Sequence, residues 1–259
     1  MELTKTNYFT TEANTEYWSV SQFKTFKDCE ARAMAELRGD YVRPETKDLL
    51  IGSYVDAYFS GVDVYNDFVN EHTDIFNKRT GELKVDFQRA DELIKVAEDD
   101  TMFMDYMIGD KQVIMAAEIF GVMWKAKIDV LHDDKIVDLK IMRDMQPIFK
   151  DGERKTFIDA WGYDIQGFIY QKIVEINTGK KLPFYLAVLT KEKTPDKEII
   201  HIPDYRLKSA GELVKYYISK FDPIKRGVEE PRGCGVCDWC RTQKKLTKPL
   251  EYEELLERI

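Results

Sequence analysis

The chain opens with segments in which apolar residues recur at helical spacing. Residues 19–38 carry such a stripe, and Ser19 stands where a helix N-cap is expected. Residues 61–110 have a polar helical pattern that is interrupted near residues 78–81. Further helices are predicted over residues 47–59, 160–177 and 205–221. The first 110 residues are therefore predicted to be mainly helical.

Strand-like patterns follow this helical part. A strand is expected from about Gln112, and apolar-rich runs at 124–131 and 136–142 flank a polar turn, which predicts a β-hairpin. Residues 184–190 (FYLAVLT) indicate a buried strand, with which residues 199–202 can pair. The order of elements predicts an α/β fold with a central mixed β-sheet flanked by helices.

The hairpin places charged residues opposite one another. If the turn centres on residues 133–134, Asp129 lies across from Asp138, and Lys127 across from Lys140. The other face pairs Val130 with Val137, Ile128 with Leu139, and Ala126 with Ile141. Like charges across a strand pair destabilise it, and a divalent cation between the carboxylates reverses that effect. A simply solvated polar face is the alternative, but the polar residues nearby favour the metal site of a nuclease.

Other polar residues complete this candidate site. Glu118 ends the strand before the hairpin and is a further candidate ligand for Mg²⁺ or Mn²⁺, although a surface role is equally compatible with its position. Lys140 leaves the same face as Asp138 and can orient an attacking water or stabilise a charged transition state. Gln166 and Tyr170 share a helix face at i, i+4 spacing; a partly buried polar pair is the alternative interpretation.

The four cysteines form a second candidate site. Cys234, Cys237 and Cys240 are separated by gaps of two residues, and Cys29 is the remaining cysteine. Four thiolates suit a [4Fe–4S] cluster or a tetrahedral Zn²⁺ ion, and the tight spacing of three of them favours the cluster. Free structural cysteines are the alternative. Ligation would join the first helix to a C-terminal segment at about residues 229–246.

Composition restricts the class of protein. The 259 residues suffice for a sizeable core in one domain, and 33% charged residues suit a soluble globular protein. We see no secretion signal and no membrane-spanning run, which predicts a cytoplasmic location. A net charge of −8 argues against broad adhesion to nucleic acid but leaves room for a local basic track. Candidates for that track are Lys125, Lys127, Lys140, Arg143, Lys150, Arg154 and Lys155.

These motifs together resemble the PD-(D/E)xK nuclease superfamily, in its RecE-like (exonuclease VIII-like) phage recombination branch. The resemblance rests on an ordered set across residues 19–240: Ser19-Val-Ser21 with Phe26 and Cys29, Gly52-Ser-Tyr-Val-Asp56, Glu118, Ile128-Asp129, Asp138-Leu-Lys140 and Gln166-Gly-Phe-Ile-Tyr170. The cysteines are similar to those of AddB-type and CRISPR-adaptation iron–sulfur nucleases, although the second gap is shorter here. The glycine motif of the family usually ends in histidine, where this chain has Asp56.

The resemblance implies a metal-dependent exonuclease that acts on the ends of linear duplex DNA. Asp129 and Asp138 would bind the metal, with Asp56 as a further ligand, while Lys140, Gln166 and Tyr170 would complete the catalytic site. A single-strand annealing protein is an implied partner and a ring an implied assembly. One nuclease domain over residues 1–259 is expected, with a helical part at about 19–110 and a catalytic core at about 111–222. The alternatives are an enzyme that processes single strands or flaps, and a non-catalytic DNA-end-binding module.

Overall fold

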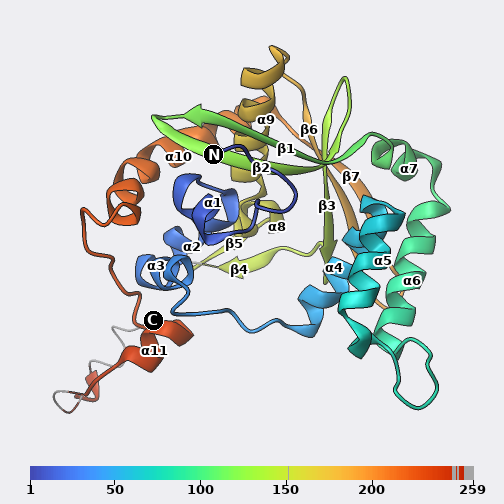
Figure 1. Cartoon of the computed structure of the whole chain (residues 1–259), viewed down its shortest axis with the longest axis horizontal. Coiled ribbons are helices and arrows are strands. Elements are labelled where there is room, and N and C mark those ends of the chain that lie inside the picture. Colours follow the sequence, from blue (N-terminus) through green and yellow to red (C-terminus); the bar gives the residue numbers. More distant parts are fainter. Residues whose placement is uncertain (151, 247–248, 250, 254–259) are drawn as a thin grey trace.

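The computed structural model, which describes residues 1–150, 152–246, 249 and 251–253, is built around a mixed five-stranded sheet (Figure 1). The strand order is β1-β2-β3-β6-β7. Strands β3 and β6 are parallel, and the other neighbouring pairs are antiparallel. The strands are β1 (Asp110–Ile119), β2 (Val122–Leu131), β3 (Ile136–Met142), β6 (Phe184–Thr190) and β7 (Lys197–Ile202). The predicted α/β class with a mixed sheet is confirmed.

Helices cover both faces of this sheet (Figure 1). One face packs against α4 (Lys47–Ser60), α6 (Val85–Glu98) and α7 (Thr101–Met107), with α5 (Val62–Glu71) and the short 3₁₀ helix η1 (Thr73–Ile75) outside them. The other face packs against α2 (Val20–Asp28), α3 (Glu30–Arg38), α8 (Phe157–Trp161), α9 (Tyr163–Thr178) and α10 (Asp204–Lys225). The remaining helices are α1 (Thr11–Glu16) and α11 (Asp238–Gln243).

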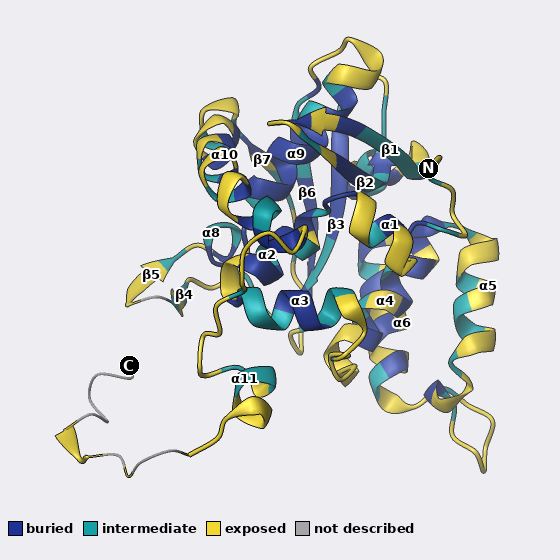
Figure 2. Cartoon of the chain, turned by 60° about the vertical axis from the view of Figure 1, so that its left-hand side comes forward, coloured by how far each residue is buried: buried dark blue, intermediate teal, exposed yellow. Residues whose placement is uncertain are grey.

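Strand β6 shows how the sheet is held between the two helical layers. Phe184, Leu186 and Val188 belong to the apolar cluster with α9 and α10, while Ala187 and Leu189 belong to the cluster with α4 and α6. A strand with both faces covered needs a continuous apolar run, which explains the sequence FYLAVLT. The buried residues accordingly follow the sheet through the middle of the molecule (Figure 2).

The predicted register of the hairpin between β2 and β3 is confirmed where the two strands pair. Val130 lies opposite Val137, and Leu131 opposite Ile136. Beyond these two pairs the strands separate, and the backbone N–H of Leu139 donates to Asp129 Oδ2 at 2.9 Å instead of to a backbone carbonyl. The prediction that Ile128 shares a face with Leu139 is therefore wrong, because Ile128 packs in the α9 cluster and Leu139 in the α4 cluster.

Two predicted helices are each broken into two. The helix expected over residues 19–38 is interrupted at Cys29, which has extended backbone angles and caps both α2 and α3. The helix expected from residue 160 begins instead at Tyr163, after Gly162 has ended α8 with a φ of 62°. The stretch before α8 also contains a small hairpin, β4 (Ile148–Lys150) with β5 (Glu153–Lys155), that the sequence did not indicate.

The N-terminal segment pairs with the part of β2 that is not paired with β3. Trp18 accepts a hydrogen bond from the N–H of Lys125 and donates to the carbonyl of Met123, both at 2.8 Å. This bridge brings α1 and the start of α2 beside the central strands. Across the described ranges of the chain, no helix combines the length and apolar character needed to span a bilayer.

Candidate functional site

Two charged residues interrupt the buried face of the central strand β3. Asp138 lies beside Leu186 and Lys140 beside Val188 in the parallel pairing with β6, where apolar side chains line the same face. Asp138 is only 1% exposed. Its Oδ2 atom faces the Lys140 ammonium but receives no hydrogen bond of ordinary geometry in the described structure. A buried carboxylate oxygen that has no well-formed hydrogen bond is a candidate ligand for a cation.

Asp129 and Asp56 stand on the elements that flank β3. Asp129 leaves β2 at the point where the hairpin opens, and Asp56 leaves α4. Both line a cavity of about 340 Å³ together with Asp138 and Lys140. Both also line an adjoining cavity of about 440 Å³ on the α2 side. The structure thus brings together three of the four carboxylates predicted from the sequence.

Helix α9 supplies the opposite wall of these cavities. Gln166 donates from Nε2 to Asp138 Oδ1 at 2.6 Å, which fixes the orientation of that carboxylate. Tyr170 lies one turn further along and lines both cavities. The predicted sharing of one helix face by Gln166 and Tyr170 agrees with this arrangement. The side-chain amide of Gln166 thus contacts a carboxylate of the site directly.

The charges in the cavity influence one another strongly. Burial, reinforced by the charges of Asp138 and Asp56, raises the pKa of Asp129 well above its ordinary value. Burial and the charge of Asp138 likewise raise the pKa of Asp56, although Lys140 opposes the shift. Burial by itself lowers the pKa of Lys140, but the carboxylates of Asp138 and Asp129 outweigh it and raise that pKa. Burial and mutual repulsion thus both disfavour the charged form of Asp129 and Asp56.

This donor set fits a hard divalent cation. Mg²⁺ and Mn²⁺ prefer carboxylate and carbonyl oxygens, and Mg²⁺ usually keeps several water ligands and uses only one or two carboxylates. The carboxylate oxygens are further apart than the ligand atoms of a tightly formed metal site. Among the described residues, only the four cysteine sulfurs discussed below form a group of three or more donor atoms within 4.8 Å of one another. Water ligands would fill the difference.

Glu118 lies away from the site, whereas Lys125 borders the larger cavity but its ammonium is bound by the protein itself. Glu118 is exposed and pairs with Met123 near the far end of β1, about 20 Å along the strand from the position opposite Asp129. It lines neither cavity, so the structure does not support it as a ligand. Lys125, a candidate for the basic track, is buried and binds the Tyr8 carbonyl and, at 2.8 Å, Asn14 Oδ1.

The structure also adds residues that the sequence analysis missed. Tyr163 lies three residues before Gln166 on α9, and the Lys140 ammonium lies 5.1 Å from the centre of its ring. Lys24 on α2 lies 5.0 Å from the same ring centre. Tyr163 could have been found from its spacing, because residues 163, 166 and 170 fall on one helix face. Lys24 carries no such signal.

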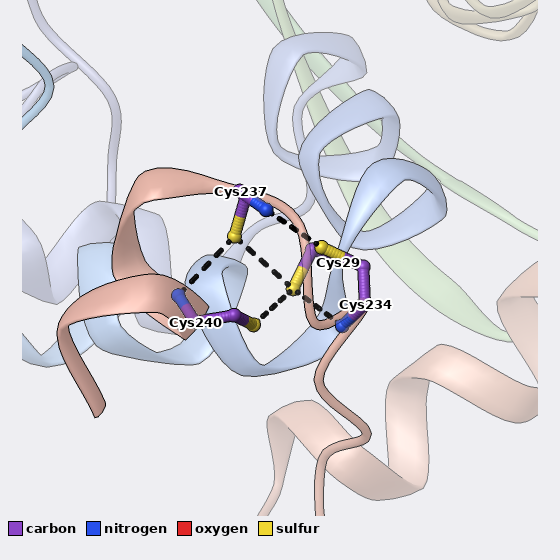
Figure 3. Close-up of side chains that lie close together, drawn as sticks. All are labelled: Cys29, Cys234, Cys237 and Cys240. Carbon is purple, nitrogen blue, oxygen red and sulfur yellow. Dashed lines mark hydrogen bonds between the residues drawn. The ribbon is translucent and has the colours of Figure 1, made fainter. Parts of the chain in front are cut away.

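The four cysteines meet at the break between α2 and α3 (Figure 3). Cys29 occupies the break, and Cys234, Cys237 and Cys240 come from the C-terminal segment that leads into α11. The segment is held against α3 by the hydrogen bond from the Ala31 N–H to the Arg232 carbonyl, at 3.0 Å. Gly233 lets the two segments approach closely, since a Cβ atom at that position would lie 3.1 Å from Cys240 Sγ, a tight contact.

The sulfur atoms are arranged like ligands of a metal. All four Sγ atoms lie within 4.8 Å of one another, and the Sγ of Cys29 lies 3.6 Å from that of Cys240 and 3.8 Å from that of Cys237. Backbone N–H groups point at the sulfurs. Burial alone would raise the pKa of Cys234, but hydrogen bonds from the N–H groups of Val236 and Cys237 lower it to about 6. Burial raises the pKa of Cys29. A metal or cluster would hold all four as thiolates.

Comparison with known proteins shows the family to which the chain belongs. Residues 19–243 match the model of a PDDEXK-like domain of unknown function, DUF3799. The chain is 42% identical to a protein from Eubacterium rectale whose crystal structure is described as that of a "putative exonuclease"; the alignment covers 98% of each chain with a TM-score of 0.93. Among curated proteins, none matches. Because the family model spans most of the chain, the protein belongs to the PDDEXK-like DUF3799 family.

Proposed function

We propose that this protein is a Mg²⁺- or Mn²⁺-dependent deoxyribonuclease that hydrolyses phosphodiester bonds from the ends of linear DNA. The observation that carries the proposal is the buried Asp138–Lys140 pair on the central strand, with Asp129 and Asp56 around the same cavity. The description of the Eubacterium rectale protein as an exonuclease supports it. The substrate is DNA, and residues 1–259 act as one nuclease domain.

The residues of the chain have distinct roles in this reaction. Asp138, Asp129 and Asp56 would hold the cation, which when bound offsets their mutual repulsion and polarises the phosphodiester. Gln166 keeps the carboxylate of Asp138 in one orientation. Lys140, charged because of its carboxylate neighbours, can hydrogen-bond the attacking water or the charge that develops on the phosphate oxygens. Tyr170 closes the cavity from the α9 side.

The size of the site supports the binding of nucleotide units. The two adjoining cavities, of about 340 and 440 Å³, are in the size range of small-molecule sites, so each suits a single nucleotide unit. An enzyme of this kind serves recombination of the phage type if it leaves a single strand for an annealing protein. That role, the ring assembly and the annealing partner rest on the family resemblance alone and remain predictions.

The proposal is tested by a time course on linear duplex DNA in Mg²⁺, Mn²⁺ or EDTA. We expect loss of the duplex in either metal and none in EDTA, with strands labelled at each end giving the polarity. A closed circular duplex of the same sequence is the control for end dependence. Cleavage of single strands alone would favour the single-strand or flap enzyme, and binding without turnover would favour an end-binding module.

We further propose that the cysteine site holds a single tetrahedral ion, Zn²⁺, in place of the [4Fe–4S] cluster that the sequence favours. Sulfurs at about 2.3 Å from one zinc ion lie about 3.8 Å apart. Two of the six sulfur–sulfur separations, at 3.6 and 3.8 Å, agree with this value, and all four sulfurs lie within 4.8 Å of one another. In a cubane cluster each thiolate binds a different iron atom, so the four sulfurs must stand further apart than around a single ion.

Metal analysis of protein purified without oxygen distinguishes the two centres. We expect about one zinc per chain and a colourless protein. About four irons and four acid-labile sulfides per chain, with a brown colour, would instead establish the cluster. Cys29→Ser is the matched variant, and it should lose most of the bound metal in either case.

A further inference from the structure

A second cation, Lys24, lines the larger cavity beside the carboxylates. It lies in the second turn of α2, and its ammonium is 5.0 Å from the centre of the Tyr163 ring. The Lys140 ammonium is 5.1 Å from the same ring centre. Gly162 leaves room for the lysine stem, since a Cβ atom there would lie 3.3 Å from Lys24 Cε. Two ammonium groups therefore share one aromatic ring at the edge of the site.

The two lysines differ in their partners. Lys140 is paired with Asp138. Lys24 makes no ion pair and no hydrogen bond to any residue that the structure describes. Burial, and then the like charge of Lys140, lower the pKa of Lys24 to about 7, although Asp138, Asp164 and Asp28 oppose the shift. A partly buried ammonium without an anion is costly, and an anionic ligand would remove that cost.

Hydroxyl donors stand on the wall of the same cavity. Ser19 and Ser21, at the start of α2, both line it, and their Oγ atoms are 3.0 Å apart. Lys127 also reaches this cavity from β2. An ammonium with two hydroxyls suits an anion that has several oxygen acceptors, such as a phosphate group.

We propose that Lys24, with Ser19 and Ser21, binds a phosphate group of the DNA strand next to the phosphate that is cleaved. The proposal rests on the proposed nuclease function. Asp56, Asp129, Gln166 and Tyr170 line both cavities, so a strand with one phosphate among the carboxylates brings its neighbouring phosphate into the Lys24 cavity. Lys24 is then a positioning residue that sets the strand in register with Asp138 and Lys140.

The test compares Lys24→Met with wild type and with Lys27→Met. Lys27 lies on the same helix but is exposed and lines neither cavity, so it controls for the loss of one lysine charge. Binding of end-labelled linear duplex is measured in EDTA over a range of salt concentrations. We expect Lys24→Met to bind about tenfold more weakly at low salt. The slope of log K against log salt should fall by about one. Lys24→Arg should restore both.

The outcomes separate this proposal from the nuclease function. If wild type cleaves DNA in metal and Lys24→Met keeps its affinity and salt slope, the phosphate site is wrong while the function stands. If Lys24→Met loses both but wild type does not cleave in metal, the phosphate site stands without the nuclease. Wild type that neither binds DNA in EDTA nor cleaves it in metal overturns both. Duplexes with and without a 5′-terminal phosphate show which phosphate Lys24 binds. If it binds an internal phosphodiester, Lys24→Met loses the same affinity for both duplexes; if it binds the terminal phosphate, the loss is confined to the duplex that carries it.

Discussion

Replacing Asp138 by asparagine is expected to reduce DNA cleavage by about 10²–10³-fold, the range for losing one electrostatic group at a reacting centre. Asparagine has the same shape, and its carbonyl oxygen can still accept the hydrogen bond from Gln166 Nε2. What it removes is the negative charge, which we expect both to bind the cation and to hold Lys140 in place. The loss should therefore appear in the rate of cleavage, with the protein still folded.

The measurement is the single-turnover rate on linear duplex in saturating Mg²⁺, beside a thermal melt of each variant. Asp133→Asn is the matched control, because Asp133 lies in the exposed turn of the same hairpin and should leave the rate unchanged. An Asp138→Asn protein that melts like wild type and cleaves within a few-fold of its rate would remove Asp138 from the catalytic site. A variant that fails to fold would be replaced by Lys140→Met, which is expected to lose activity in the same way.

Local patterns predicted the hairpin and its carboxylates because strand periodicity and a short turn leave few alternatives. The register at Val130–Val137 and Leu131–Ile136 followed directly from the position of the turn. The separation of β2 from β3 beyond these pairs could not be predicted from the position of the turn. It depends on the N-terminal segment, which pairs through Trp18 with β2 where β3 no longer does. That contact joins residues more than 100 apart, and no local pattern encodes it.

The same distinction explains why Glu118 lies away from the cavity and why Lys24 was not found from the sequence. Glu118 is a carboxylate on β1, the strand next to Asp129. The position opposite Asp129 is Gln112, however, and Glu118 lies six residues further along, at about 3.3 Å per residue, so it is far from the cavity. Lys24 sits on a helix that packs against the sheet from another part of the chain. Only the tertiary arrangement shows that its ammonium reaches the ring of Tyr163.

Breaks in the helices also depend on distant partners. The helical stripe of residues 19–38 continues through Cys29, so periodicity alone predicts one helix. In the fold, the Cys29 thiol accepts a hydrogen bond from the N–H of Cys234 at 3.4 Å as well as from that of Arg32 in α3 at 3.5 Å. The break thus serves to present the sulfur to the C-terminal segment, and it makes this position the natural place to test the metal centre.

Cys29→Ser is expected to destabilise the protein by about 3–5 kcal/mol, the range for removing a cross-link that closes a long loop. The loop between Cys29 and Cys240 spans 211 positions. Serine keeps the helix cap, because its hydroxyl can accept from the Arg32 N–H as the sulfur does, so the loss isolates metal binding. For a chain of this length the Tm should fall by about 10 °C.

A chelator makes the experiment decisive. Wild type should melt lower after prolonged treatment with a strong chelator, and its Tm should then approach that of untreated Cys29→Ser, which itself should hardly respond. Val236→Ser is the matched control, because Val236 is 57% exposed in the same cysteine-bearing loop and has no ligand role. A Cys29→Ser protein that melts within about 2 °C of wild type would show that the four sulfurs do not hold the C-terminal segment to the body of the protein. The carboxylates of the proposed catalytic site lie in a separate cavity, so protein that has lost the cysteine-bound metal but stays folded should still bind DNA.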